Sequence, residues 1–285
     1  MTLYDNPETW RASGSTWDCD GLPIFYKQQG SGVPLVCLHG FPTASWDFYK
    51  IWPALIARHS VLALDFIGFG YSAKPAGADY SIVNQADIVE ALMAKLGIRR
   101  AHLLCHDYGV SVGQELLARK ADGDGVDWID CTMLNGGLFP ETHRPRFIQR
   151  LLLSPLGPLV AKFTSKNRFD KNLRAVFGPN TPPSEAELDH YWTLLIRNRG
   201  RERVPDLIRY MTERKVHRER WVSALDSDVP IRIINGTLDP VSGGHMVDRY
   251  EELFPGRDVT RLKHIGHYPH MEDPNAVVGA LFPSR

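Results

Sequence analysis

The sequence predicts an α/β fold with a mostly parallel, eight-stranded sheet and helices on both faces. Short apolar runs alternate with amphipathic stretches of helical length, the pattern of strand–helix–strand units. The runs are almost continuously apolar, as expected for parallel strands covered on both faces. An opening hairpin supplies two of the strands. It turns at Asp20 and Gly21, and the other strands are expected at residues 34–38, 61–65, 101–105, 128–134, 231–235 and 259–263.

Helices are expected in the gaps between these runs, near residues 45–58, 83–97, 109–120, 244–253 and 273–282. One gap is different, because residues 139–225 form a long, helical and arginine-rich block between two expected strands. We interpret this block as a helical cap. The predicted core domain then consists of residues 1–138 and 226–285, with the cap of residues 139–225 inserted in it.

Charge is distributed unevenly between these two parts. The cap holds 17 Lys or Arg against 9 Asp or Glu, whereas the rest of the chain holds 16 against 24. Basic helices that lean on an acidic core explain this balance, and the alternative is a cap that favours anionic substrates. Over the whole chain 33 basic residues meet 33 acidic ones, so no overall field attracts nucleic acid or an anionic membrane. We therefore expect a small-molecule substrate and neither nucleic acid nor membrane as a partner.

The cysteines and the N-terminal region indicate in which cellular compartment the protein is expected. Cys19, Cys37, Cys105 and Cys131 show no metal-type pairing, and at least three of them sit in apolar runs. Residues 1–10 are polar and acidic, and no stretch approaches the roughly 20 apolar residues of a membrane span. These features predict a reduced, cytoplasmic protein and leave a homodimer open.

The strongest chemical signal lies in the run from Leu103 to Gly113. A strand ends in the letters CHDYG at residues 105–109 and a helix begins at once, which is typical of a nucleophile elbow. An elbow needs small residues two positions before and after the nucleophile, and the helix N-terminus favours negative charge there. Gly109 meets this need and Cys105 meets it roughly. Asp107 stands at the turn between the expected strand and the expected helix and is the candidate nucleophile; the alternative is an ordinary helix N-cap.

Two further members of a catalytic set follow in the chain order expected of such an elbow. The run 231–235 leads into GTLD, which places Asp239 at the carboxyl end of the sheet. His267 follows the last expected strand, 28 residues later. We predict that His267 acts as the base and that Asp239 orients it. The nearest competitor is His264, and a solvated loop histidine is the alternative for His267.

The loop HGFP after the run 34–38 can aim the backbone N–H of Phe41 at a developing oxyanion, and the N–H of Tyr108 is the second donor. A metal site is not expected. His102 and His106 share one face of a strand, but no second pair of ligands converges nearby in the sequence. We expect no cofactor either.

With HGFP, DFIGFGYSAKP, HDYG and GHYPHMEDP in place, the chain resembles the α/β-hydrolases that use an aspartate nucleophile. The likeness covers about residues 33–280. Epoxide hydrolases and haloalkane dehalogenases are the two main branches, and the chain is more similar to the epoxide-hydrolase branch. The resemblance implies the α/β-hydrolase fold, an inserted cap and a covalent ester on Asp107.

Epoxide hydrolases use cap tyrosines that hydrogen-bond the epoxide oxygen. SEAELDHY, Gly200 and residues 207–210 match the form that carries one of them, so the resemblance implies this role for Tyr210. The other tyrosine is expected early in the cap, yet no tyrosine lies between Tyr108 and Tyr191. Either a histidine or tryptophan takes its place or Tyr210 acts alone. The candidate substrate contacts are His39, His143, Trp192 and Trp221.

The function that this resemblance implies is hydrolysis of an epoxide to a vicinal diol, with water as the second substrate. Attack of an aspartate on an acyl substrate would give an anhydride, so ordinary esterase activity is disfavoured. The first alternative is a haloalkane dehalogenase. Its halide donors are typically an Asn after His-Gly and a Trp after the nucleophile, where Phe41 and Tyr108 stand here. The second alternative is a non-catalytic small-molecule binder.

Overall fold

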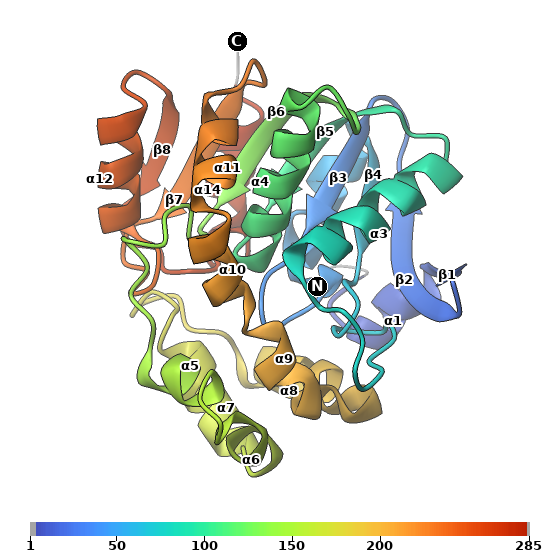
Figure 1. The fold of residues 1–285 in the computed structure, drawn as a ribbon, viewed down its shortest axis with the longest axis vertical. Helices are drawn as coiled ribbons and strands as arrows, with labels where there is room; N and C mark the ends of the chain where they lie inside the picture. The colour runs from blue at the N-terminus through green and yellow to red at the C-terminus, as the bar shows by residue number, and fades with distance from the viewer. Residues whose placement is uncertain (1–3, 284–285) are drawn as a thin grey trace.

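The computed structural model describes residues 4–283 and contains one eight-stranded sheet with the order β1-β2-β4-β3-β5-β6-β7-β8 (Figure 1). The expected strands lie within two residues of their predicted bounds. They are β1 (Ser15–Cys19), β2 (Leu22–Gln29), β3 (Pro34–Leu38), β4 (Ser60–Leu64), β5 (Arg100–Cys105), β6 (Asp127–Leu134), β7 (Ile231–Gly236) and β8 (Asp258–Leu262).

The sheet is antiparallel at one edge and parallel elsewhere. β1 pairs with β2 through a two-residue turn at Asp20 and Gly21, whose φ angles of 51° and 84° are those a tight hairpin requires. β2 is also antiparallel to β4, whereas the strands from β4 across to β8 are parallel. The mostly parallel sheet is thus confirmed. The carboxyl ends of β3, β5, β6 and β7 share one edge, where loops can bring side chains together.

The helices outside the long insertion pack on the two faces of the sheet, and α4 lies against β3, β5 and β6. The helix expected at residues 45–58 is divided in two. Pro53 lies in the first turn of the second part, where its missing N–H costs nothing. These helices are α1 (Pro7–Ala12), η1 (Ser45–Lys50), α2 (Trp52–Ile56), α3 (Ile82–Lys95), α4 (Tyr108–Ala121), α12 (Gly244–Leu253), α13 (Pro269–Glu272) and α14 (Pro274–Leu281).

Residues 139–225, here called the inserted segment, run between β6 and β7 and are helical, as expected. They are divided into short pieces, at some points by prolines and glycines, and Figure 1 shows α5 to α9 beyond the carboxyl edge of the sheet. The pieces are α5 (Phe147–Leu152), α6 (Gly157–Lys162), α7 (Lys166–Arg174), α8 (Glu185–Ile196), η2 (Arg197–Arg203), α9 (Val204–Leu207), α10 (Tyr210–Val216), α11 (Arg218–Ser223) and η3 (Ala224–Asp226).

Three of the four cysteines are buried in the core, as predicted, and none of the four forms a disulfide. Burial raises the pKa of the Cys37 thiol, which behaves as a small apolar group. Among residues 4–283, no helix combines the length and the apolar character that crossing a bilayer requires.

Candidate active site

Asp107 lies in the turn between β5 and α4, at the carboxyl edge of the sheet. Its backbone has φ 47° and ψ −105°, a strained conformation for a residue other than glycine. The strain is held by tight packing: its N–H donates to the carbonyl of Asn135 at 2.8 Å. A Cβ atom added to Gly109 would lie 2.3 Å from the carbonyl oxygen of Leu38. Only glycine lets α4 approach β3 this closely, as expected of an elbow.

The cysteine two positions before Asp107 stands where an elbow usually has glycine. Its side chain is accommodated by a glycine elsewhere, since a Cβ atom added to Gly113 would lie 2.6 Å from the Cys105 sulfur. Cys105 is fully buried between its strand and α4. The departure from the usual elbow pattern is therefore compensated one turn into the helix.

The structure brings Asp107, His267 and Asp239 into direct contact. The His267 Nε2 lies 3.3 Å from Asp107 Oδ2, and its Nδ1 donates to Asp239 Oδ2 at 2.7 Å. Each of the three residues is at most 5% exposed. Asp239 follows β7, and His267 lies in the loop between β8 and α13. The competitor His264 is exposed and lies outside this contact.

The charges of these groups stabilise one another. Burial would lower the pKa of His267, but the two flanking carboxylates raise it to about 10. Burial would raise the pKa of Asp107, but its hydrogen bond with His267 and the charge of that residue hold it well below its usual range. For the same reasons, and through a hydrogen bond from Asn135, the pKa of Asp239 falls to about 2. Near neutral pH the free site holds an imidazolium between two carboxylates.

Asn135 connects the carboxylate of Asp239 with the backbone of Asp107 and was missed by the sequence reasoning. It directly follows β6, and its side-chain NH2 donates to Asp239 Oδ2 and to the carbonyl of Gly236, both at 2.9 Å. Its Oδ1 accepts the Gly236 N–H at 2.6 Å, and its backbone carbonyl accepts the N–H of Asp107. A polar residue at the carboxyl end of a buried strand was the available signal.

The predicted oxyanion donors lie beside Asp107. The Phe41 N–H donates to Asp107 Oδ1 at 2.8 Å. Tyr108 is the first residue of α4, so its N–H has no acceptor within the helix. His39 does not contact the substrate space, which corrects our expectation. Its ring lies between two backbone groups, because Nδ1 donates to the Gly40 carbonyl at 2.8 Å and Nε2 accepts the Phe66 N–H at 3.1 Å.

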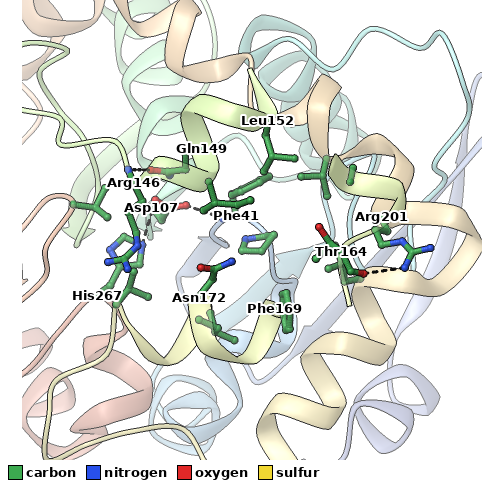
Figure 2. A pocket seen from close by; sticks show the side chains of 18 of the residues that line it. Phe41, Asp107, Arg146, Gln149, Leu152, Thr164, Phe169, Asn172, Arg201 and His267 are labelled. Carbon is green, nitrogen blue, oxygen red and sulfur yellow. Dashed lines mark hydrogen bonds and ion pairs between the residues drawn. The ribbon is translucent and has the colours of Figure 1, made fainter. Parts of the chain in front are cut away.

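A cavity of about 130 Å³ opens onto Asp107, His267 and Tyr210. The inserted segment supplies most of the walls, which are largely apolar. Leu152 and Phe169 are among their apolar residues, and Arg146, Thr164, Asn172 and Arg201 are among the polar ones. Figure 2 shows Asp107 and His267 on one side and Thr164 and Arg201 on the other. Its size is comparable with a cavity of about 150 Å³ that admits benzene. The cavity thus suits a small, mostly apolar molecule.

Three other predicted substrate contacts do not line this cavity. Trp221 is buried in α11 and donates to Glu115 on α4 at 2.7 Å, so it serves packing. Trp192 packs behind the cavity wall, with its ring centroid 5.6 Å from that of Phe169. His143 is largely buried, and both of its ring nitrogens lack hydrogen-bond partners in the described part of the chain. These positions were expected from residue type alone, which carries no information about depth.

Glu272 ties the loop of His267 to the inserted segment, a role the sequence did not suggest. Its carboxylate accepts the N–H groups of Gly266, Tyr268 and Gly178 at 2.8–2.9 Å and the hydroxyl of Thr181 at 2.5 Å. Glu272 and Asp273 directly precede the last helix, where an acidic side chain commonly caps the first turn. Only Asp273 does so, by accepting the N–H of Ala276 at the start of α14.

A second cluster of titratable groups lies behind Asp107. Within residues 4–283, Asp47, His106 and His270 form a buried group whose ligand-type atoms lie within 4.8 Å of one another. Tetrahedral zinc holds its ligand atoms about 3.4 Å apart, because its bonds are about 2.1 Å long. His106 Nδ1 and Asp47 Oδ2 are 3.9 Å apart. Burial raises the pKa of Asp47 to about 8 and lowers that of His106 to about 3, so we interpret the cluster as neutral packing.

Comparison with known proteins places this site in a family. The mesoderm-specific transcript homolog protein of Homo sapiens is 45% identical over 95% of this chain and 85% of its own length. The solved structure of the haloalkane dehalogenase DatA from Agrobacterium tumefaciens C58 matches with a TM-score of 0.79 and 24% identity, over 94% of each chain. That of the epoxide hydrolase CorEH matches with a TM-score of 0.75 and 20% identity, over 94% of this chain and 96% of its own.

These two solved structures share the fold while their names describe different reactions. The family model of the alpha/beta hydrolase fold matches residues 33–274, which include the elbow, the inserted segment and the loop of His267. The chain therefore belongs to the α/β-hydrolase family.

Proposed function

We propose that this hydrolase converts an epoxide to a vicinal diol through a covalent ester on Asp107. The observation that carries the proposal is a carboxylate at the elbow, held at 3.3 Å from a histidine and facing a cavity that Tyr210 also lines. An alkyl ester of a carboxylate can be hydrolysed, whereas an acyl substrate would leave an anhydride. A tyrosine hydroxyl matches the need of an opening epoxide, whose oxygen becomes an alkoxide.

In the first step an oxygen of Asp107 attacks an epoxide carbon, and the carbon–oxygen bond of the ring breaks. The electron pair moves to the ring oxygen, which takes the proton of the Tyr210 hydroxyl. The tyrosinate recovers a proton from the His267 imidazolium through solvent. Ester formation favours this transfer, because it removes the Asp107 charge that helps to raise the pKa of His267.

In the second step neutral His267 takes a proton from water, and the oxygen attacks the carbonyl carbon of the Asp107 ester. The N–H groups of Phe41 and Tyr108 stabilise the tetrahedral oxyanion. The ester bond breaks, the departing alkoxide takes the proton from His267, and the diol leaves. Asp107 is released as a carboxylic acid and returns its proton to His267, which restores the starting charges. Asp239 holds the imidazole in position throughout.

The inserted segment is proposed to act as a cap over the core formed by residues 1–138 and 226–285. It supplies Tyr210 and most of the apolar cavity wall, so substrate size and shape would be selected there. The cavity favours small or slender epoxides with apolar substituents.

The test is a trapping experiment with His267→Gln, incubated with styrene oxide, aliphatic epoxides and, separately, 1-bromoalkanes. The variant should open the epoxide once and then stall, so mass spectrometry should find the epoxide mass on Asp107. Asp107→Ala should remain unmodified, and the parent protein should release diol. An adduct formed only from bromoalkanes, with bromide release by the parent protein, would establish a dehalogenase instead. No adduct with any of these reagents would overturn the proposal.

A further inference from the structure

A buried cation lies directly beneath the proposed proton donor. Arg214 is 3% exposed, although guanidinium groups are rarely buried without a carboxylate partner. No ion pair of Arg214 exists among residues 4–283. Its neighbour Glu213 is engaged elsewhere, where it accepts the N–H of Ile82 at 2.8 Å. No carboxylate among the described residues therefore neutralises the positive charge of Arg214, and this charge acts on the neighbouring groups of the active site.

The guanidinium is fixed by contacts with the elbow and with Tyr210. Its Nε donates to the Ser111 hydroxyl at 2.7 Å, in the first turn of α4, and its Nη2 lies 3.4 Å from the carbonyl oxygen of Asp107. Its Cζ lies 4.6 Å from the centre of the Tyr210 ring, four residues earlier on α10. Gly137 also makes room for the guanidinium, because a Cβ atom added there would lie 2.4 Å from the Arg214 Nη1.

A fixed positive charge against a phenol ring stabilises the phenolate more than the neutral phenol. We propose that Arg214 is a positioning residue that acts through Tyr210: its charge stabilises the negative charge that Tyr210 gains as its proton moves to the epoxide oxygen. This inference rests on the proposed epoxide hydrolysis. The same charge supplies part of what a second tyrosine would otherwise contribute, and no tyrosine lies between Tyr108 and Tyr191.

The electrostatics of the site agree with this role. Burial raises the pKa of Tyr210, the Asp107 carboxylate raises it further, and Arg214 acts against both. Once Asp107 has become a neutral ester, the carboxylate effect is gone and the effect of Arg214 remains. Tyr210 thus becomes a stronger acid as the alkoxide forms, when its proton is needed.

The test is a double-mutant cycle in the His267→Gln protein, where the rate of adduct formation with styrene oxide is followed by mass spectrometry. Arg214→Met should slow this step about tenfold or more, because the charge that favours proton transfer is lost. The same change should cost less than about twofold when it is combined with Tyr210→Phe, since no proton then moves from residue 210. Arg214→Lys should restore part of the rate. Lys215→Met, an exposed cation on the same helix, is the matched control and should leave the rate unchanged.

An equal slowing with and without the Tyr210→Phe change would overturn the inference, because Arg214 would then act on Asp107 or on the fold. An unchanged rate in Arg214→Met would also overturn it. If Arg214→Met does not fold, Ser111→Ala releases the guanidinium and should show the same dependence on Tyr210 with a smaller loss. Absence of an epoxide adduct in the His267→Gln protein itself identifies failure of the proposed function, not of the role of Arg214.

Discussion

Replacing Gly109 by alanine should damage both stability and activity, because its position allows no side chain. The added Cβ would lie 2.3 Å from the Leu38 carbonyl oxygen and 2.8 Å from that of His39, whereas ordinary contacts begin near 3.4 Å. Both obstacles are backbone atoms at the end of β3, so relief requires α4 to move by about 1 Å. Overpacking of this kind typically costs 1–3 kcal/mol. Because a central strand must also shift, we expect a loss of about 3 kcal/mol.

The same displacement would separate the Phe41 N–H from Asp107, which now lie within 2.8 Å. A misplacement of about 1 Å at a reacting centre can reduce a rate about 10²-fold. Urea unfolding gives the stability, and the rate of diol release gives the activity. Gly279→Ala is the matched control, since no atom lies within 4 Å of its added Cβ and it lies inside α14. That change should stabilise the protein by about 0.5–1 kcal/mol. A Gly109→Ala protein as stable and as active as the control would refute the reasoning.

Three further results are expected. Asp107→Ala should abolish diol release although the protein still folds, and retention of a tenth of the parent activity would contradict its role as nucleophile. The pKa of His267, which burial would lower, is raised to about 10 by its carboxylate neighbours, so its contribution to stability is complete below about pH 6.5 and is lost towards pH 10. Urea unfolding at pH 7 and pH 10 should therefore show a larger loss for the parent protein than for His267→Gln. Glu272→Gln should speed amide hydrogen exchange at Gly266 and Tyr268, and unchanged protection would show that its carboxylate does not hold this loop.

The strand positions and the contact between Asp107, His267 and Asp239 could be anticipated because both depend on chain order. Buried parallel strands leave continuous apolar runs, and their carboxyl ends must meet at one edge of the sheet. Residues that follow those runs are therefore brought together whatever the loops do. Asp239 and His267 are far apart in the sequence, yet each follows such a run.

The walls of the cavity could not be anticipated in this way. The inserted segment consists of short helices whose orientation depends on packing against the core, and several of them have apolar residues on more than one side. Phe169 therefore lines the cavity, whereas Trp192 packs against Phe169 and does not line it. The sequence does not single out Arg214, because α10 contains further charged residues. Only its burial in the structure distinguishes it from them.

The contacts of Glu272 limit how the cavity can open. Gly178 and Thr181 of the inserted segment share this carboxylate with Gly266 and Tyr268, and the N–H of His267 donates to the carbonyl of Val176 at 2.9 Å. Residues 176–181 therefore move with the histidine, as part of the core. A hinge that admits substrate without disturbing His267 must lie outside this stretch. Opening of the cavity would then be a movement of helices α5 to α7 relative to residues 176–181, which stay attached to the core.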